Sequence, residues 1–351
     1  MGGNALAKHG AKRVSKEVFD LELAKAYLLL ESIGDETGID FRKHCIESYR
    51  KKSDFGDIDI LVESSLFENI RPENFIAYAS HFYEKEIPWI KNGSVLSFGA
   101  PLESGGCLQI DLIITPNHSF DFSSAYFAWN DLGNLMGRIA HKMGLKFGHD
   151  GLWLPIRKDS RLIDSILVTR NFKAALMLLG YDAERWYEGF DSIEDIFKFV
   201  VSSEKFNSDI YLFENRNNKS RTRDKKRPNY NGFLDWVNAQ KNLPSYAWNK
   251  DKSIYLNEIF EAFPLAMHDF KCALLKDEKK QLFKNNFNGK VVGEITSLSG
   301  ESLGLFMSKY KKANQIFLAK IEDNPTEDLI LQLMDSIKGF YLKNNEGNLG
   351  Q

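Results

Sequence analysis

The sequence has little cysteine and no long apolar run. Only three of its 351 residues are cysteines, far apart and without a Cys-x-x-Cys pair. This usage indicates a reducing compartment and excludes a disulfide framework and a zinc ribbon. No stretch approaches the roughly eighteen apolar residues of a membrane-spanning helix, and the N-terminal segment lacks the apolar core of a signal peptide. We therefore predict a soluble, cytoplasmic protein without membrane contacts.

The chain also lacks an excess of charge of either sign. Its formal net charge is −2, so any contact with nucleic acid must come from a local patch. Hydrophobic residues make up 43% of the chain, which suffices for one large or two ordinary cores. We expect two or three modules.

What the sequence does contain is a pair of acids on a predicted strand, residues 53–62, Ser-Asp-Phe-Gly-Asp-Ile-Asp-Ile-Leu-Val. Apolar residues alternate there with Asp57 and Asp59, so both carboxylates leave one face of a sheet. Like charges at that spacing raise each other's pKa unless a cation lies between them. Asp111, on a second alternating strand at residues 107–115, supplies a third acid. The other interpretation is an edge hairpin whose acids face water.

Three such carboxylates are the pattern that two-metal nucleotidyl transfer requires. They hold two Mg²⁺ ions about 4 Å apart, one activating the attacking hydroxyl and one steadying the triphosphate. We predict that Asp57 and Asp59 bind both ions, with Mn²⁺ as an alternative metal. Asp111 is predicted to bind the catalytic ion and to help deprotonate the acceptor.

Residues just upstream of the acidic strand are candidates for holding the triphosphate. A hydroxyl and three cations lie there, and the strand itself opens with a glycine; the candidates are Ser48, Arg50, Lys51, Lys52 and Gly56. The alternative for the basic run is a solvated turn. Gly2 and Gly3 either fray at the terminus or let the backbone approach a phosphate.

Residues 119–154 carry a resemblance to a known family. The segment includes Ala-Tyr-Phe-Ala-Trp-Asn-Asp-Leu-Gly-Asn-Leu-Met-Gly-Arg and ends in Gly-His-Asp-Gly-Leu-Trp-Leu. With Gly-Asp-Ile-Asp-Ile-Leu-Val and Gln-Ile-Asp-Leu-Ile-Ile, it resembles the palm and nucleotide-closing segment of family X DNA polymerases over residues 43–200. The counterparts in register are Tyr126, Phe127, Asn134, Arg138, Ala140, Gly144, Gly151 and Leu152.

This resemblance implies roles for several side chains. Tyr126 and Phe127 are implied to pack on the sugar of the incoming nucleotide, and Asn134 to reach the base edge. Arg138 is implied to contact a polynucleotide or the nucleotide. If the acids were not present, the simpler interpretation would be that Tyr126 and Phe127 are core aromatics and that Arg138 is a surface charge on a helix.

Two departures from the family pattern concern the nucleotide site. Ala-Trp-Asn, ending at Asn130, replaces the family's Thr-Gly-Ser turn, which removes the glycine that permits close backbone approach. We include Asn130 among the nucleotide-binding candidates. Glu47-Ser48 replaces the family's Gly-Ser phosphate motif, so either Ser48 serves alone or Gly2 and Gly3 supply the backbone amides. Too few residues precede the predicted palm for the family's DNA-gripping N-terminal domain, so we expect an untemplated or specialised transferase.

A dense basic run follows at residues 216–227, where Asp224 is the only acid. Such a patch favours an anionic partner. We predict a flexible loop that grips nucleic-acid phosphates, the alternative being a solvated linker. Its cations are Arg216, Lys219, Arg221, Arg223, Lys225, Lys226 and Arg227.

These features predict an α+β protein: a small mixed or antiparallel nucleotidyltransferase palm sheet with helices on one face, then an all-helical C-terminal module. We expect helices over residues 16–31, 71–84 and 184–201. The predicted modules are residues 1–155 (palm), 156–215 (closing helical subdomain), 216–230 (basic loop) and 231–351 (helical domain). Near Ser299-Gly300-Glu301, the predicted helical domain is faintly similar to tRNA nucleotidyltransferases and poly(A) polymerases.

The predicted function is metal-dependent transfer of a nucleoside monophosphate from a nucleoside triphosphate to a nucleic-acid 3′ hydroxyl, with release of pyrophosphate. RNA, such as tRNA, is the favoured acceptor. Two alternatives stay open, namely nucleotidylation of a protein or small-molecule hydroxyl and a catalytically inactive nucleic-acid-binding protein.

Overall fold

The computed structural model describes residues 5–346, so the prediction for Gly2 and Gly3 lies outside the described residues. The chain divides into two compact units. The first comprises Met1–Pro155 and Leu167–Pro264, and the second comprises Ile156–Ile166 and Leu265–Gln351. Each unit is described by itself below. Within residues 5–346, no helix combines the length and the apolar character needed to cross a membrane.

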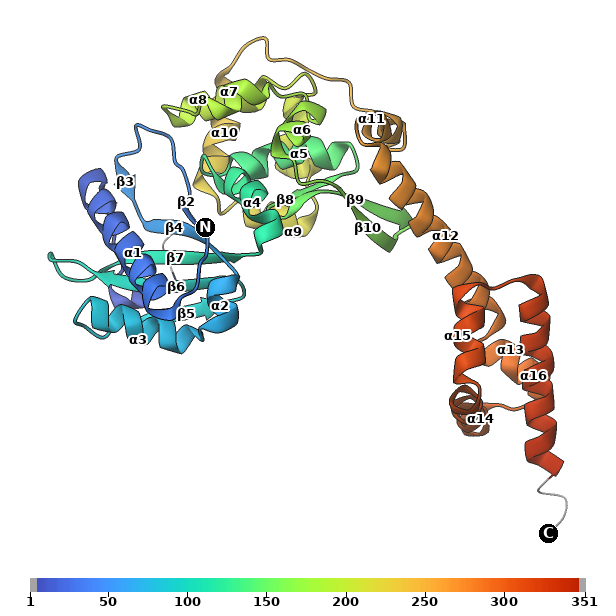
Figure 1. Cartoon of the computed structure of the whole chain (residues 1–351). Helices are drawn as coiled ribbons and strands as arrows, with labels where there is room; N and C mark the ends of the chain where they lie inside the picture. The colour runs from blue at the N-terminus through green and yellow to red at the C-terminus, as the bar shows by residue number, and fades with distance from the viewer. Residues whose placement is uncertain (1–4, 347–351) are drawn as a thin grey trace. The chain divides into compact units, whose positions relative to one another are not determined.

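A five-stranded sheet of order β2-β4-β7-β6-β5 organises the first unit (Figure 1). β4 and β7 pair in parallel, whereas the other neighbours are antiparallel, so the sheet is mixed. The protein is therefore an α+β protein. The strands are β2 (Lys43–Cys45), β4 (Asp57–Glu63), β5 (Trp89–Asn92), β6 (Val95–Pro101) and β7 (Cys107–Thr115).

One face of this sheet packs against α1 (Lys16–Thr37) and α3 (Pro72–Phe82), close to the helices expected there (Figure 1). Apolar side chains from both helices and from alternate positions of β4 and β7 form a single buried core. Full burial of each such side chain contributes about 1.5–3 kcal/mol, so this face sets the register of the acidic strand.

Apolar side chains also pack on the opposite face of the sheet, whereas we expected helices on one face only. Phe120, at the start of α4 (Phe120–Phe127), packs there against Leu61 and Ile113. Asp57, Asp59 and Leu61 alternate along β4, so the acids share a face with this smaller cluster. Helix α2 (Ser65–Asn69) follows β4, and the short strands β1 (Val14–Ser15) and β3 (Asp54–Phe55) pair with each other.

The remainder of the first unit is mostly helical. The helix expected at residues 184–201 is in fact two, because the chain turns at Gly189 with φ of 76°. Asp182 caps the first helix and Ser192 the second, each accepting backbone N–H groups. The elements are α5 (Leu132–Lys142), α6 (Phe172–Leu178), α7 (Ala183–Tyr187), α8 (Ile193–Val201), α10 (Pro228–Ala239) and α11 (Ile254–Ala262), with a sheet of β8 (Lys146–Gly148), β9 (Gly151–Lys158) and β10 (Arg161–Thr169).

The basic run is not the flexible loop that we expected. Residues Asn218–Asp224 form helix α9, and α10 begins at Pro228. Asn217 caps α9 by accepting a hydrogen bond of 2.9 Å from the Ser220 amide. The charged run therefore folds into a short helix and the turn that follows it.

In the second unit, the helices of the described residues up to 346 pack around Phe287, Phe306 and Tyr310. It also includes Ile156–Ile166 from strands β9 and β10, so it is not purely helical. Arg161 in that segment donates two hydrogen bonds, of 2.8 and 2.7 Å, to the Asp277 carboxylate. The helices are α12 (Pro264–Asn286), α13 (Gly289–Thr296), α14 (Gly300–Ala313), α15 (Gln315–Asp323) and α16 (Glu327–Glu346).

Candidate metal centre and its surroundings

The strand register brings the three predicted acids together. In the parallel β4–β7 pair Asp59 lies directly opposite Asp111, and Asp57 precedes Asp59 by two residues on the same face. One carboxylate oxygen from each of the three lies within 4.8 Å of the others. This spacing suits ligands that share a divalent cation.

The electrostatics of the cluster are unfavourable without a cation. Burial, followed by repulsion from Asp57 and Asp111, raises the pKa of Asp59 to about 7. Its Oδ1 atom is shielded from solvent and has no hydrogen-bond partner. A buried unpaired carboxylate oxygen is costly, and a hard cation with oxygen ligands would relieve that cost. The donor set therefore fits Mg²⁺ or Mn²⁺.

Two residues around Asp111 were not predicted from the sequence. Gln109 donates from Nε2 to both carboxylate oxygens of Asp111, at 2.9 and 3.0 Å. Burial raises the pKa of Asp111, whereas hydrogen bonds from Ser97 and Gln109 lower it. Ser97 is the cross-strand partner of Asp111 on β6. The available signal for Gln109 was its position two residues before Asp111, on the same face of the strand.

Of the predicted triphosphate-binding cations, Lys52 lies next to the acids. Burial lowers the pKa of Lys52, and the charges of Asp57 and Asp59 act in the opposite direction. Gly56 is close to Arg13, since a Cβ there would lie 2.8 Å from the Arg13 Nη1 atom. Arg13 is ion-paired with the exposed Asp54. Ser48 is half-buried, two residues after Ile46, whose amide donates to the Asp59 carbonyl oxygen at 2.9 Å.

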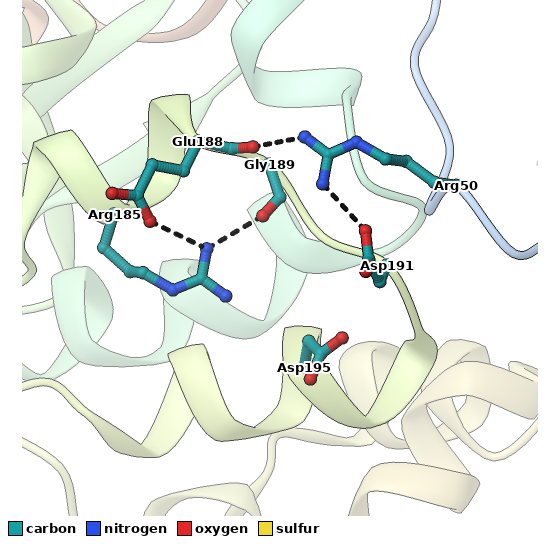
Figure 2. Close-up of a pocket in the computed structure, with 6 residues that line it drawn as sticks. All are labelled: Arg50, Arg185, Glu188, Gly189, Asp191 and Asp195. Atoms are coloured by element: carbon teal, nitrogen blue, oxygen red, sulfur yellow. Dashed lines mark hydrogen bonds and ion pairs between the residues drawn. The ribbon is translucent and has the colours of Figure 1, made fainter.

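Arg50 lines a pocket of about 420 Å³ around Gly189 (Figure 2), and the Lys51 ammonium lies 4.0 Å from the Asp191 carboxylate. Arg50 donates to Asp191 at 2.9 Å and to the Glu188 carbonyl oxygen. Its amide also donates to the Phe190 carbonyl, and the Lys51 amide donates to the Asp191 carbonyl, both at 2.9 Å. Three carboxylates and only two arginines line the pocket, so a phosphate is disfavoured there. Arg50 and Lys51 hold the α7–α8 connection instead.

Tyr126 and Phe127 are the last two residues of helix α4. Phe127 packs against the cluster of Leu61 and Ile113. The Tyr126 ring lies 5.5 Å from that of Phe127 and 5.3 Å from that of Phe147. Both aromatic residues are half-buried, so each has part of its surface open to a ligand.

The turn after this aromatic pair has an unusual backbone. Trp129 and Asn130 have φ of 61° and 63°, a left-handed conformation that costs non-glycine residues energy. The turn thus adopts a left-handed backbone without a glycine. Asn130 Oδ1 and Asn134 Nδ2 are buried without hydrogen-bond partners, and Arg223 donates to Asn134 Oδ1 at 3.0 Å. These amides could receive a polar ligand.

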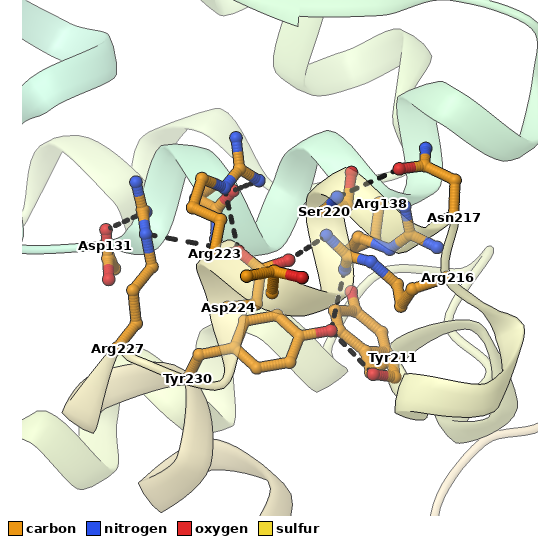
Figure 3. Close-up of polar contacts among 12 residues, drawn as sticks. Asp131, Arg138, Tyr211, Arg216, Asn217, Ser220, Arg223, Asp224, Arg227 and Tyr230 are labelled. Atoms are coloured by element: carbon orange, nitrogen blue, oxygen red, sulfur yellow. Dashed lines mark hydrogen bonds and ion pairs between the residues drawn. The ribbon is translucent and has the colours of Figure 1, made fainter.

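Arg138 and Arg216 are buried, contrary to the predictions that Arg138 contacts a polynucleotide or nucleotide and that Arg216 contacts nucleic-acid phosphates. Figure 3 shows the two arginines among their polar neighbours. Arg138 donates twice to the Ile210 carbonyl oxygen, at 3.1 and 2.8 Å, so it is neither a surface charge nor available to a polynucleotide. Burial, with the nearby charge of Arg216, lowers the Arg138 pKa to about 10. Arg216 is ion-paired with the fully buried Asp224 and donates to the Tyr230 hydroxyl at 2.7 Å.

Asp224 also organises the other arginines of the basic run. Arg223 contacts its carboxylate at 3.0 Å, and Arg227 approaches it at 4.0 Å while pairing with Asp131 at 2.6 Å. Arg221 donates to the Arg216 carbonyl oxygen. Lys219, Lys225 and Lys226 are exposed, and so is Arg223 despite its contacts with Asp224 and Asn134.

The scan of protein-family models and the search of curated proteins both find no match for this chain.

Proposed function

We propose that the protein is a metal-dependent nucleotidyltransferase with a polymerase-type palm. The observation that carries the proposal is the convergence of Asp57, Asp59 and Asp111 from two parallel strands onto one point of the sheet. Such carboxylates would hold two Mg²⁺ ions, which when bound polarise the acceptor hydroxyl and neutralise the phosphates. The orphaned Oδ1 of Asp59 supports a cation there.

In the proposed reaction an acceptor hydroxyl oxygen forms a bond to the α-phosphorus, and the bond from that phosphorus to pyrophosphate breaks. We assign the acceptor proton to the Asp111 carboxylate and the positioning of the triphosphate to Lys52. Tyr126 and Phe127 would contact the sugar, because Phe127 packs on the acidic face of the sheet and the Tyr126 ring lies 5.5 Å from the Phe127 ring. Asn130 and Asn134 have buried polar atoms available for a base.

The favoured acceptor is an RNA 3′ end. The exposed lysines of α9 and the turn after it support this choice, because they offer cations to a phosphate backbone. Nucleotidylation of a protein or small-molecule hydroxyl would use the same acids, so the acceptor must be identified by experiment.

The test is an incubation of the protein with labelled nucleoside triphosphates, Mg²⁺ and separate pools of RNA, DNA and protein. We expect label in RNA. Label in protein alone would mean that the acceptor is a protein hydroxyl and not an RNA 3′ end. Asp59→Asn should reduce transfer by at least about 10³-fold, since the change removes a ligand from the reacting centre. Asp54→Asn, an exposed acid on the preceding strand, is the matched control. Retained transfer in Asp59→Asn would exclude the assigned site.

A further inference from the structure

The N-terminal segment of the described chain docks along the strand that carries Asp111. We call residues 6–12 the N-terminal strap. The Lys12 amide donates to the Cys107 carbonyl oxygen at 3.1 Å, and the Cys107 amide donates to the Gly10 carbonyl oxygen at 3.2 Å. Leu6, at the start of the strap, is only 1% exposed. The strap is therefore anchored at both ends.

A close approach between two glycines permits this docking. A Cβ on Gly106 would lie 2.6 Å from the Gly10 carbonyl oxygen, a backbone atom that cannot swing aside. Gly105, the preceding residue, has nearly the same left-handed φ, 77° against 73°, but nothing lies within 4 Å of the position of its Cβ. The two neighbouring glycines thus differ in their contact with the strap and hardly in backbone conformation.

The strap also forms a hydrogen bond with Gln109. The Leu6 amide donates to Gln109 Oε1 at 3.1 Å, which orients the Gln109 amide with its nitrogen toward Asp111. Nε2 then donates to both oxygens of that carboxylate. Gln109 is 2% exposed, so water cannot take over these contacts. If the amide flipped, Oε1 would face the carboxylate and repel it.

We infer that Gln109 is a positioning residue that fixes the carboxylate plane of Asp111 for metal binding, and that the strap sets the orientation of Gln109. The inference rests on the proposed function of the acidic triad. Groups that hydrogen-bond to metal ligands orient them, and their loss typically weakens metal affinity about 10–100-fold.

The experiment measures Mn²⁺ binding to the full chain, without nucleotide, by the electron paramagnetic resonance signal of free Mn²⁺. Gln109→Met keeps the length of the side chain and removes the amide. Gly106→Ala displaces the strap without touching Gln109, and Gly105→Ala is its matched control. We expect the first two variants to bind Mn²⁺ about 10-fold or more weakly. Gly105→Ala should stay within about twofold of the wild type, because its added methyl group meets no atom.

Thermal unfolding of each variant shows whether it is folded at the temperature of the measurement. If Gln109→Met fails to fold, the two glycine variants still decide whether the strap matters. Equal Mn²⁺ affinity of Gly106→Ala and Gly105→Ala would overturn the role of the strap, and unchanged affinity in folded Gln109→Met would overturn that of Gln109. Absence of Mn²⁺ binding by the wild type would instead overturn the proposed function.

Discussion

At the scale of single residues, the acidic triad is a source of instability that a ligand would reverse. Asp59 has two carboxylates beside it and a buried oxygen without a partner. Folding therefore favours the protonated form of Asp59 over the charged form. Binding sites commonly retain such unfavourable groups, because the ligand supplies the missing interaction.

We predict that metal-free protein loses stability as the pH rises. The pKa of Asp59 is raised from about 4 in the unfolded chain to about 7 in the folded chain. The folded state then binds the proton more tightly, so this contribution is present below pH 4 and is lost as the pH rises through 7. Thermal unfolding in EDTA at pH 5 and pH 8 should show a larger loss for the wild type than for Asp59→Asn.

Mg²⁺ provides the control for this prediction. At pH 8 we expect it to stabilise the wild type and to have little effect on Asp59→Asn, because the variant lacks one ligand. An Asp59→Asn variant that is less stable than the wild type in EDTA at pH 8 would contradict the repulsion argument.

The buried pair of Arg216 and Asp224 gives a second prediction at this scale. Arg216→Met leaves the Asp224 carboxylate buried with only Arg223 and Arg227 beside it. We expect the free energy of unfolding to fall by about 3–5 kcal/mol, as when one partner of a buried pair is removed. Lys219→Met, at an exposed position of α9, should change it by less than about 0.5 kcal/mol. Equal effects in denaturant titrations would contradict this account.

At the scale of elements, the α7–α8 connection shows how a cation near a site can have a structural role. The chain turns at Gly189, and the carbonyl oxygens of Phe190 and Asp191 accept hydrogen bonds from the amides of Arg50 and Lys51. The segment that leads to the acidic strand is therefore tied to the helical part of the same unit. The side chain of Arg50 completes this connection.

We predict that Arg50 couples to Asp191 and not primarily to the nucleotide. Both side chains are about half exposed, at 56% and 49%. A double-mutant cycle with Arg50→Ala and Asp191→Ala should therefore give a coupling of about 0.2–1 kcal/mol in unfolding. Lys52→Ala should raise the nucleotide KM more than Arg50→Ala does, since Lys52 lies beside the triad. If Arg50→Ala raised the nucleotide KM more than Lys52→Ala did, Arg50 would be assigned to the nucleotide site.

At the scale of the whole molecule, charge is nearly balanced and the basic run is partly neutralised within the fold. A net charge of −2 gives no general attraction to nucleic acid. Arg216 is buried, and Arg223 and Arg227 have acidic partners. For the proposed binding of a polynucleotide, the exposed cations of the run are Lys219, Arg223, Lys225 and Lys226.

We predict that Lys225→Ala/Lys226→Ala weakens RNA binding and lowers its dependence on salt. Each lost phosphate contact should reduce the slope of log K against log salt by about 0.7–0.9. Lys85→Ala/Lys91→Ala, which removes two exposed lysines from another part of the chain, should leave the slope unchanged. Fluorescence titrations at several salt concentrations measure RNA binding by both variants. Equal slopes would show that Lys225 and Lys226 do not contact the RNA.

The sequence alone was enough to locate the two strands and their three acids. Alternation of apolar and polar residues is local, and burial of one face of β4 and β7 then sets the direction of Asp57, Asp59 and Asp111. The same reasoning suggested helices close to α1 and α3. Long-range contacts had no such local signal, which is why Arg138 and Arg216 were predicted to contact a nucleotide or nucleic acid.

Only the tertiary structure decided which polar groups serve the site and which serve the fold. Burial and partners depend on segments far apart in the chain, such as Ile210 for Arg138 and Asp191 for Arg50. Likewise, the hydrogen bond from the Leu6 amide to the Gln109 side chain joins positions 103 residues apart. Periodicity determines the face that a side chain leaves, whereas packing determines what that side chain meets.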